Sequence, residues 1–245
     1  MLAKLRAALW IDPLIVLDTI VMGTLSMIAS LFDKKGFAQH RIACVWARFI
    51  VFVAGMKVEV EGLEKIDPHG VYVLVSNHLS LTDTPLLMAV IPLQFRFFAK
   101  QGLFRIPFLG GHLGRAGHLP VVFDDARAGL RALSAGARLT RERGVSVLVF
   151  PEGGRSDDGT LKRFEGGAAY VAIKAGVPAL PIGIVGTREV LPMHSLIVRP
   201  GAVRLRVGDP IPVAGLRTRD HARLTRELHQ KIAELTGQGT PVQCN

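Results

Sequence analysis

The sequence predicts an α/β fold, a mixed and mostly parallel sheet covered by helices, preceded by a pair of apolar helices. Two observations support this prediction. From Lys57 onward, short apolar runs typical of strands alternate with longer runs of helical periodicity. Before Lys57, two long apolar segments follow each other with only a short polar turn between them. We therefore expect a membrane-docking two-helix hairpin over residues 1–56 and an α/β domain over residues 57–245.

The first apolar segment, from Pro13 to Leu31, contains a single charge, Asp18. A membrane span needs about 20 apolar residues, and an aspartate at the bilayer centre costs about 2.5–3.5 kcal/mol. A full span is therefore possible but not favoured. Asp12 and Asp18 interrupt the apolar core that a signal peptide requires, and no clear cleavage site follows.

The second apolar segment, from Ala38 to Ala54, is amphipathic. Its apolar positions follow helical spacing and lie opposite Arg41 and Arg48, namely Ile42, Val45, Trp46, Phe49, Ile50 and Val53. The arginines can reach the lipid headgroups while the apolar stripe enters lipid. We expect a hairpin that lies in one leaflet. A single true span and an ordinary pair of core helices are the alternatives.

The composition predicts anionic partners. The chain has 245 residues, enough for one sizeable domain with a small addition. Its 30 Lys and Arg exceed its 20 Asp and Glu, which gives a net charge of +10, and 49% of its residues are hydrophobic. The apolar amino terminus, together with only two Tyr and two Trp, favours an anionic membrane surface and no nucleic acid. The alternative is that the charge only keeps the protein soluble.

The two cysteines, Cys44 and Cys244, lie far apart and have no metal-ligand spacing. We therefore expect a reducing compartment, no disulfide framework and no metal site. The glycines at 110, 111, 114 and 117 do not form a G-x-G-x-x-G pattern, and no G-x-x-x-x-G-K-[ST] occurs. The sequence thus predicts no nucleotide cofactor.

Strands and helices alternate after residue 57. Strands are expected at Val58 to Val60, Val71 to Ser76, Phe95 to Ala99, Val145 to Phe150, Ala179 to Val185 and Val203 to Val207. Helices are expected at 85 to 90, at 125 to 143, at 165 to 175 and from about Arg219 to Leu235. The apolar stripes of these helices are expected to form the core.

A histidine and an aspartate, His78 and Asp83, stand five residues apart just after an expected strand. On a regular helix they would point about 140° apart, so they can meet only if the chain turns between them. Turn-forming side chains separate them, and Thr84-Pro85 has the pattern of an N-cap followed by proline at the first helical position. An imidazole held by a carboxylate is suited to general-base chemistry at neutral pH.

Four blocks, in the same order, resemble those of the glycerolipid acyltransferase family. The stretch Asn77-His78-x-Ser80-x-x-Asp83 matches the NHxSxxD form of the family's H-x4-D motif, and Val149 to Ser156 resembles its FPEGTRS block. Lys100 to Gly110 and Val177 to Ile182 are similar to the other two blocks. The resemblance runs from about Lys57 to about Pro212 and is closest to the bacterial 1-acylglycerol-3-phosphate acyltransferases.

The resemblance implies acyl transfer from a thioester to a hydroxyl group. We expect His78 to be the general base and Asp83 to fix its tautomer and stabilise the imidazolium, as in two members of a serine hydrolase triad. The substrate hydroxyl would replace the serine, since the chain has no G-x-S-x-G elbow. That missing elbow also weakens a thioesterase or lipase interpretation.

The substrate-binding residues are expected to be Asn77, Lys100, Glu152, Gly153, Gly154 and Arg155. Arg155 is the expected anion clamp, because a guanidinium can pair with two phosphate oxygens and the glycines before it permit close approach. Asn77 is expected to order the turn, and Glu152 to orient Arg155 or the acceptor hydroxyls. For Lys100, a role in polarising the thioester carbonyl competes with that of a solvated lysine at a strand end. For Arg155, the alternative is a surface ion pair.

Two positions depart from the family pattern. Gly154 stands where the family has threonine, which removes a hydroxyl from the acceptor loop. Phe123, in the stretch Val121 to Asp124, stands where relatives carry an arginine, so one phosphate ligand is missing. The side chains that could replace it are Arg115, Arg127 and Lys162.

We therefore expect an acyltransferase that acts on the sn-2 hydroxyl of 1-acylglycerol-3-phosphate in phospholipid synthesis. The donor would be acyl-CoA or an acidic acyl carrier protein, used as a co-substrate without any cofactor. The expected location is the cytoplasmic face of the inner (plasma) membrane. One alternative, suggested by Phe123, is another lysolipid acceptor such as a lyso-aminolipid. A second is a non-catalytic lipid-binding protein.

Overall fold

The computed structural model describes residues 7–122, 125–195 and 197–238. Its sheet has seven strands in the order β1-β7-β6-β2-β5-β3-β4. Neighbouring strands are parallel except β6 and β7, which are antiparallel. In chain order the strands are β1 (Met56–Glu61), β2 (Val73–Ser76), β3 (Phe95–Lys100), β4 (Leu119–Val121), β5 (Ser146–Val149), β6 (Ala179–Val185) and β7 (Gly201–Val207). The prediction of a mixed, mostly parallel sheet is confirmed.

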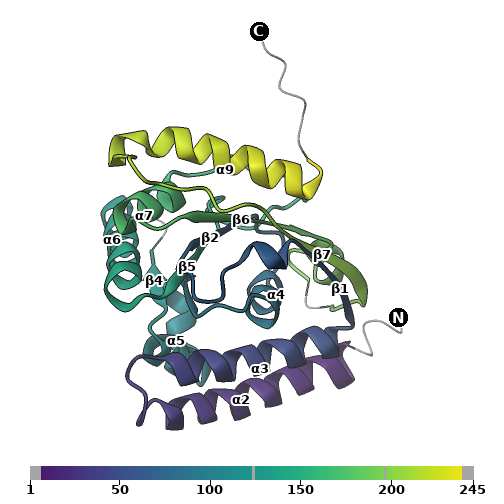
Figure 1. Ribbon diagram of the computed structural model, residues 1–245. Helices are drawn as coiled ribbons and strands as arrows, with labels where there is room; N and C mark the ends of the chain where they lie inside the picture. Colours follow the sequence, from purple (N-terminus) through teal and green to yellow (C-terminus); the bar gives the residue numbers. More distant parts are fainter. Residues whose placement is uncertain (1–6, 123–124, 196, 239–245) are drawn as a thin grey trace.

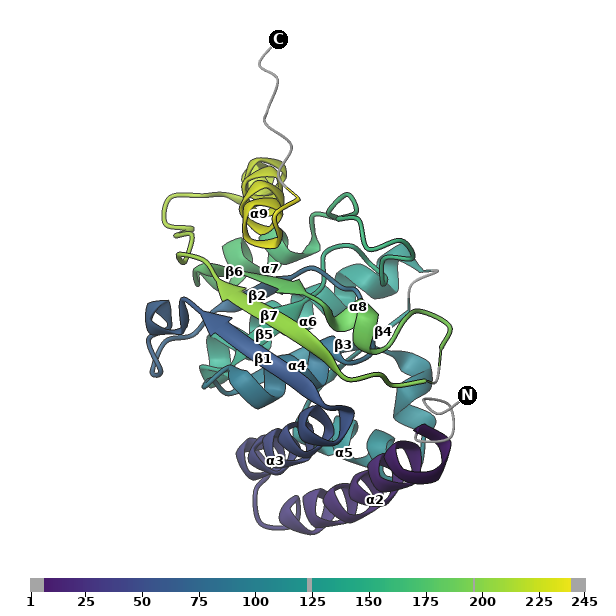
Figure 2. The ribbon, with the colours of Figure 1, turned by 90° about the vertical axis from the view of Figure 1, so that its right-hand side faces the viewer.

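Helices cover both faces of this sheet (Figures 1 and 2). One layer holds α2 (Asp12–Ala29), α3 (Phe37–Ala54), α4 (Asp83–Val90) and α5 (Leu109–Ala116). The opposite layer holds α6 (Ala126–Arg143), α7 (Gly167–Ala175) and α9 (His221–Thr236). The short α8 (Thr187–Val190) follows β6, and single turns occur at η1 (Ala7–Ile11), η2 (Leu63–Lys65), η3 (Gln101–Arg105) and η4 (Thr218–Asp220). A separate apolar core fills each side.

The middle of the sheet is apolar on both faces. Every residue of β2 and β5 is buried, in agreement with their unbroken runs of valine and leucine. Parallel strands end at the same edge, so the chain leaves β2, β5, β3 and β6 on one side of the molecule. Crevices at the carboxyl ends of such strands are where α/β proteins bind ligands.

The two amino-terminal helices pack together and onto the α/β unit. Trp46 on α3 donates a hydrogen bond to Thr19 Oγ1 on α2 at 3.1 Å. The inner face of α3, which packs mainly against α4, is a row of small residues that includes Ala43, Ala47 and Ala54. These residues belong to the same core cluster as the strands. Of the stripe predicted to enter lipid, only Ile50 is buried in the protein. Both helices are long and apolar enough to cross a membrane, by length and composition alone.

Three local features differ from the sequence prediction. Helix α4 begins at Asp83 and not at Pro85, and Thr82 at its N-cap makes no side-chain capping bond. Strand β4 has only three residues, too few to show a pattern. Helix α5 lies in a glycine-rich stretch that has low helix propensity. It packs so closely that a Cβ on Gly110 would lie 2.2 Å from the carbonyl oxygen of Phe104.

A buried polar cluster joins α2 and α5 to the sheet. Arg96 is 1% exposed, and its guanidinium donates to the carbonyl oxygens of Phe95 at 2.9 Å and Lys35 at 3.3 Å. His112 Nδ1 lies 2.7 Å from Ser26 Oγ, and the rings of His112 and His118 lie 5.5 Å apart. Burial, reinforced by the charge of Arg96, lowers the pKa of His112 to about 4. Burial also lowers the pKa of His118 well below its ordinary value.

Because of these buried histidines, we expect the free energy of unfolding to decrease in mild acid. Because the pKa of His112 is lower when folded, the unfolded chain binds more protons between about pH 4 and 6.5. The stabilisation is present above this window and is lost as the pH falls through it. Between pH 7 and 5, His112 alone should lower the free energy of unfolding by roughly 1–2 kcal/mol. Denaturant unfolding in detergent at both pH values measures this loss.

His112→Gln, which cannot titrate, should lose less stability between pH 7 and 5 than the wild type loses. The control is His69→Gln, because His69 is exposed and should leave the pH dependence unchanged. If His112→Gln has the same pH dependence as the wild type, the assigned pKa is wrong.

Candidate active site

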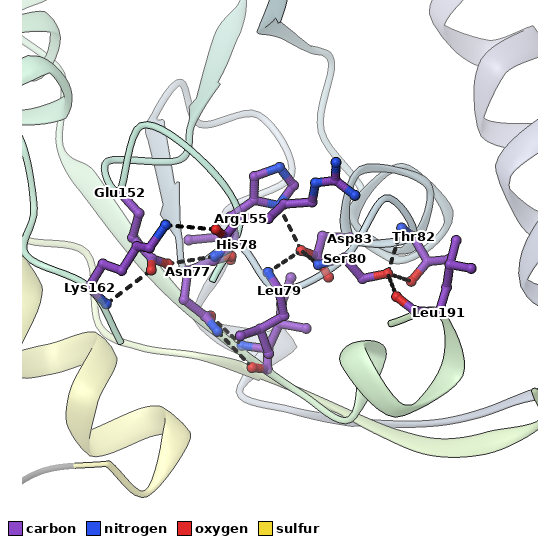
Figure 3. A network of polar contacts seen from close by, with 12 residues as sticks. Asn77, His78, Leu79, Ser80, Thr82, Asp83, Glu152, Arg155, Lys162 and Leu191 are labelled. Atoms are coloured by element: carbon purple, nitrogen blue, oxygen red, sulfur yellow. Dashed lines mark hydrogen bonds and ion pairs between the residues drawn. The ribbon is translucent and has the colours of Figure 1, made fainter. Parts of the chain in front are cut away.

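The loop between β2 and α4 brings His78 and Asp83 together. Asp83 is fully buried as the first residue of α4, and its Oδ2 lies 2.7 Å from His78 Nδ1. The same oxygen accepts hydrogen bonds from the backbone N–H groups of Leu79 at 2.7 Å and Ser80 at 2.8 Å. The expected turn between the two residues is therefore present, and Asp83 itself holds it (Figure 3).

This contact sets the tautomer of His78. A carboxylate can only accept, so we assign the ring proton to Nδ1 and a free lone pair to Nε2. The imidazole stacks on the ring of Phe150, with centroids 4.0 Å apart and planes 13° from parallel. The side chain of His78 keeps 19% of its surface exposed, whereas that of Asp83 keeps none. A base whose orientation is fixed therefore faces a region that a substrate can reach.

Glu152 joins the β5 loop to the β2 loop. Its Oε1 accepts from the backbone N–H of His78 at 2.7 Å, and its Oε2 accepts from the backbone N–H of Lys162 at 3.0 Å. Burial raises the pKa of Glu152, and these two hydrogen bonds oppose that rise. Within the described residues no ion pair joins Glu152 to Arg155. Glu152 thus orients the backbone beside His78, and the expectation that it orients Arg155 is not met.

Arg155 lies next to His78 through backbone contacts. The N–H of Ser156 donates to the carbonyl oxygen of His78 at 2.8 Å, and Lys162 Nζ donates to the carbonyl oxygen of Arg155 at 2.7 Å. In the parts of the chain that the structure describes, no hydrogen bond or ion pair engages the Arg155 guanidinium. Figure 3 shows it beside the His78 ring, although the two side chains come from the loops after β5 and β2. This cation is available to an anionic group.

The turn before Arg155 is open. Gly153 has φ +70°, a conformation that residues with a Cβ rarely adopt. A Cβ placed on Gly153 or on Gly154 would meet no atom within 4 Å. The turn can therefore receive a ligand close to its backbone, as the sequence predicts.

Asn77 orders the chain at the start of this turn, as expected, and is not placed to bind a substrate. The residue is 1% exposed, its Nδ2 donates to the carbonyl oxygen of Ile184 at 2.8 Å, and its Oδ1 accepts from the N–H of the same residue at 2.8 Å. Ser80 makes a similar link, since its Oγ donates to the carbonyl oxygen of Leu191 at 2.8 Å. Asn77 thus fastens the end of β2 to β6 and presents no free polar group to a substrate.

The other predicted side chains lie at or near the same edge. Lys100 is exposed at the carboxyl end of β3, which pairs with β5, and makes no hydrogen bond within the described ranges. Lys162 Nζ is held by Arg155, which weakens it as a substitute phosphate ligand. Phe123 and Cys244 lie outside the described residues, so their predicted significance stays a prediction. Among the described residues, no cluster of His, Cys, Asp and Glu could hold a metal ion.

Sequence reasoning missed an apolar cavity beside the catalytic loop. It has a volume of about 220 Å³ and is lined by side chains of α2, α3, α4 and α5, with Leu81 from the loop itself. The first residues of α4, Thr84 and Pro85, also contribute to its wall. Its position depends on α5, which the sequence pattern did not reveal. Through Leu81, Thr84 and Pro85 the cavity adjoins the loop and helix that carry His78 and Asp83.

The edge of the sheet thus combines an oriented histidine–aspartate pair, an open glycine turn with a cation and an adjoining apolar cavity. A family model described as Acyltransferase matches residues 57–185. The chain belongs to the acyltransferase family.

Curated relatives share this family's sequence features. A chloroplastic 1-acyl-sn-glycerol-3-phosphate acyltransferase from Arabidopsis thaliana is 38% identical over 210 residues, covering 83% of this chain and 56% of the relative. An enzyme of the same name from Pseudomonas aeruginosa is 29% identical over 230 residues, covering 91% of this chain and 87% of the relative. This chain spans about half to two thirds of the plant and algal relatives, at 53–65% of their length.

The fold matches a solved structure. The crystal structure of the 1-acyl-sn-glycerophosphate acyltransferase from Thermotoga maritima superposes with a TM-score of 0.79. The alignment covers 95% of each chain at 24% sequence identity. This similarity establishes a common fold that includes both the amino-terminal helices and the α/β unit.

Glu152→Gln should destabilise the chain. An amide has only one acceptor oxygen, so its NH₂ group would face one of the two backbone N–H donors that Glu152 now satisfies. Leaving a buried donor unpaired costs about 1–3 kcal/mol, which denaturant unfolding can measure. Glu165→Gln is the matched control because the side chain of Glu165 is exposed on the same loop. Equal stability of the two variants would contradict the bridging role.

Proposed function

We propose that this chain transfers a fatty acyl group from acyl-CoA or an acyl carrier protein to the sn-2 hydroxyl of 1-acylglycerol-3-phosphate. The observation that carries the proposal is the 2.7 Å contact between His78 Nδ1 and Asp83 Oδ2, which leaves Nε2 as the available base on a side chain that is 19% exposed. The names of the curated relatives support the choice of acceptor. No cofactor takes part, since the thioester itself supplies the activated acyl group.

The reaction follows from the geometry of His78. Its Nε2 removes the proton from the acceptor hydroxyl while the hydroxyl oxygen attacks the thioester carbonyl carbon. The tetrahedral intermediate then collapses, the C–S bond breaks, and the thiolate takes the proton from the imidazolium. Asp83 stabilises the imidazolium throughout, because its Oδ2 stays hydrogen-bonded to Nδ1. Lys100, on the same sheet edge, is proposed to polarise the thioester carbonyl.

Arg155 holds the acceptor in this proposal. Its unpaired guanidinium can form two parallel hydrogen bonds to a phosphate, which fixes the orientation of the glycerol backbone. The open turn at Gly153 and Gly154 lets the headgroup approach the backbone. Effective transfer needs this positioning, since holding the reactants in line supplies much of the rate enhancement.

The apolar surface supports a location on the membrane. Many large apolar side chains of α2 and α3 are exposed, among them Val16 at 57%, Leu17 at 58% and Phe52 at 80%. Leu81 of the catalytic loop is also exposed, at 57%, and lies beside the apolar cavity. The proposed arrangement is a hairpin that lies in one leaflet at the cytoplasmic face of the inner membrane, with the lipid acceptor entering from that leaflet.

His78→Ala should lower kcat about 10²–10⁴-fold, the usual contribution of a general base. The backbone bond from His78 to Glu152 is kept, so the change isolates the imidazole. The measurement is release of free thiol by purified protein in detergent, with labelled donor and a panel of lysolipids. His69→Ala should retain wild-type turnover.

Full turnover by His78→Ala would refute the mechanism. In the same panel, a preference for a lyso-aminolipid over lysophosphatidate would transfer the proposal to that acceptor. Hydrolysis of the donor without any acceptor would instead indicate a thioesterase. Lysolipid binding that survives His78→Ala, with no turnover by the wild type, would indicate a non-catalytic lipid-binding protein.

Filling the apolar cavity should shorten the preferred acyl chain. Ala43 lines the cavity and is 5% exposed, so Ala43→Leu reduces the space without changing polarity. We expect kcat/KM to fall for long-chain substrates and to change little for medium-chain ones, measured with matched sets of donors and acceptors. Val45→Leu is the control, because Val45 is 50% exposed on the same helix. An unchanged chain-length profile in Ala43→Leu would remove the cavity from the proposed acyl site.

A further inference from the structure

Helix α6 carries a row of basic side chains that the proposed chemistry does not use. Four arginines lie at helical spacings of four, seven and three residues and therefore share one face, namely Arg127, Arg131, Arg138 and Arg141. All four are exposed. Together with Lys174 they line an open groove of about 820 Å³. We call these five cations the basic row.

The basic row is not explained by the stability of its own helix. From Ala126 to Arg141 the helix contains no acidic residue. Like charges three or four residues apart destabilise a helix by about 0.2–0.5 kcal/mol per pair, and cations in the first turn oppose the helix dipole. Among the residues that the structure describes, the row has one acidic partner, Asp125, whose carboxylate lies 3.8 Å from Arg131 in an exposed pair. An external anionic partner would offset this repulsion.

One member of the basic row is held in place across two helices. Lys174 Nζ on α7 donates to Ser134 Oγ on α6 at 3.1 Å and to the Tyr170 hydroxyl at 2.7 Å. The ammonium thus stays in the groove instead of sampling many rotamers. Leu130, which is 52% exposed, adds an apolar contact in the same groove. Fixed cations around an apolar side chain are typical of a protein interface rich in arginine.

The location of the row favours a protein over a membrane. Helices α6 and α7 lie on the sheet face opposite α2 and α3 (Figure 1). The exposed side chains of α2 and α3 include many large apolar ones. From Arg127 to Arg141 the row is roughly 21 Å long at 1.5 Å per residue, which suits an acidic helix better than a single phosphate group. Strand β4 is parallel to β3, so it ends on the same edge of the sheet as the His78 loop. Arg127, the first arginine of the row, follows β4 by a few residues and therefore lies toward that edge.

We propose that the basic row docks the acidic surface of an acyl carrier protein and so delivers the thioester to the site. This inference rests on the proposed function and selects one donor of the two. Complementary charge would raise the rate of encounter and fix the orientation of the donor. A CoA thioester carries phosphate groups but lacks an acidic protein surface that could span the whole row, so it should depend on the row much less.

The test is a comparison of two donors with the same acyl chain, one on a carrier protein and one on CoA. The double variant Arg131→Glu with Arg138→Glu should lower kcat/KM for the carrier-protein donor at least about tenfold and leave the CoA value within about twofold. Retained CoA activity also shows that the variant folds. The control is Arg223→Glu with Arg226→Glu, an equal change of charge on exposed positions of α9.

Three outcomes would overturn the inference. In the first, kcat/KM falls equally with both donors, and in the second it falls with neither. In the third, the fall in kcat/KM follows reduced binding to vesicles of anionic lipid and not reduced binding to the carrier protein. Binding of holo carrier protein, without an acyl group, to the wild type and the variant provides a readout independent of turnover. If the wild type binds the carrier protein but transfers acyl groups from neither donor, the proposed function fails while the docking surface stands.

Discussion

The architecture of the site depends on one carboxylate oxygen. Asp83 Oδ2 accepts hydrogen bonds from the His78 ring and from two backbone N–H groups, all within 2.8 Å. A buried carboxylate needs such donors, because its desolvation is otherwise costly. The bonds to Oδ2 also bend the loop and orient the imidazole. The shape of the loop and the orientation of His78 therefore both depend on Asp83.

Around this oxygen, segments far apart in the sequence converge because parallel strands end together. Glu152, at the end of β5, binds the backbone of His78 across 74 residues of sequence. Asn77 forms hydrogen bonds with Ile184 in β6, which is 107 residues away in the sequence. These links attach the catalytic loop to the centre of the sheet, where every residue of β2 and β5 is buried. Rigid support of this kind is what a positioned base requires.

Local signals in the sequence were sufficient for most elements and for the contact between His78 and Asp83. Apolar runs located every strand except β4, helical periodicity located α6 and α9, and turn residues indicated that His78 could meet Asp83. The rest depends on contacts between distant residues. Nothing near Asn77 indicates that its amide pairs with Ile184, and nothing near Glu152 reveals two backbone donors. Helix α5 was missed because its glycines have poor propensity but allow close packing, so tertiary contacts override the local preference.

The small-residue face of α3 has a consequence for how the protein meets lipid. Because Ala43, Ala47 and Ala54 share a core with the strands, the amino-terminal hairpin is not a removable tether. Removing the hairpin would expose apolar residues of this core cluster to solvent, so the remaining α/β unit would not be a stable soluble domain. Membrane adsorption and conformational stability are thus thermodynamically linked, since any lipid that binds the outer face of the hairpin also holds its inner face against the sheet. A bilayer would act on this fold as a stabilising ligand.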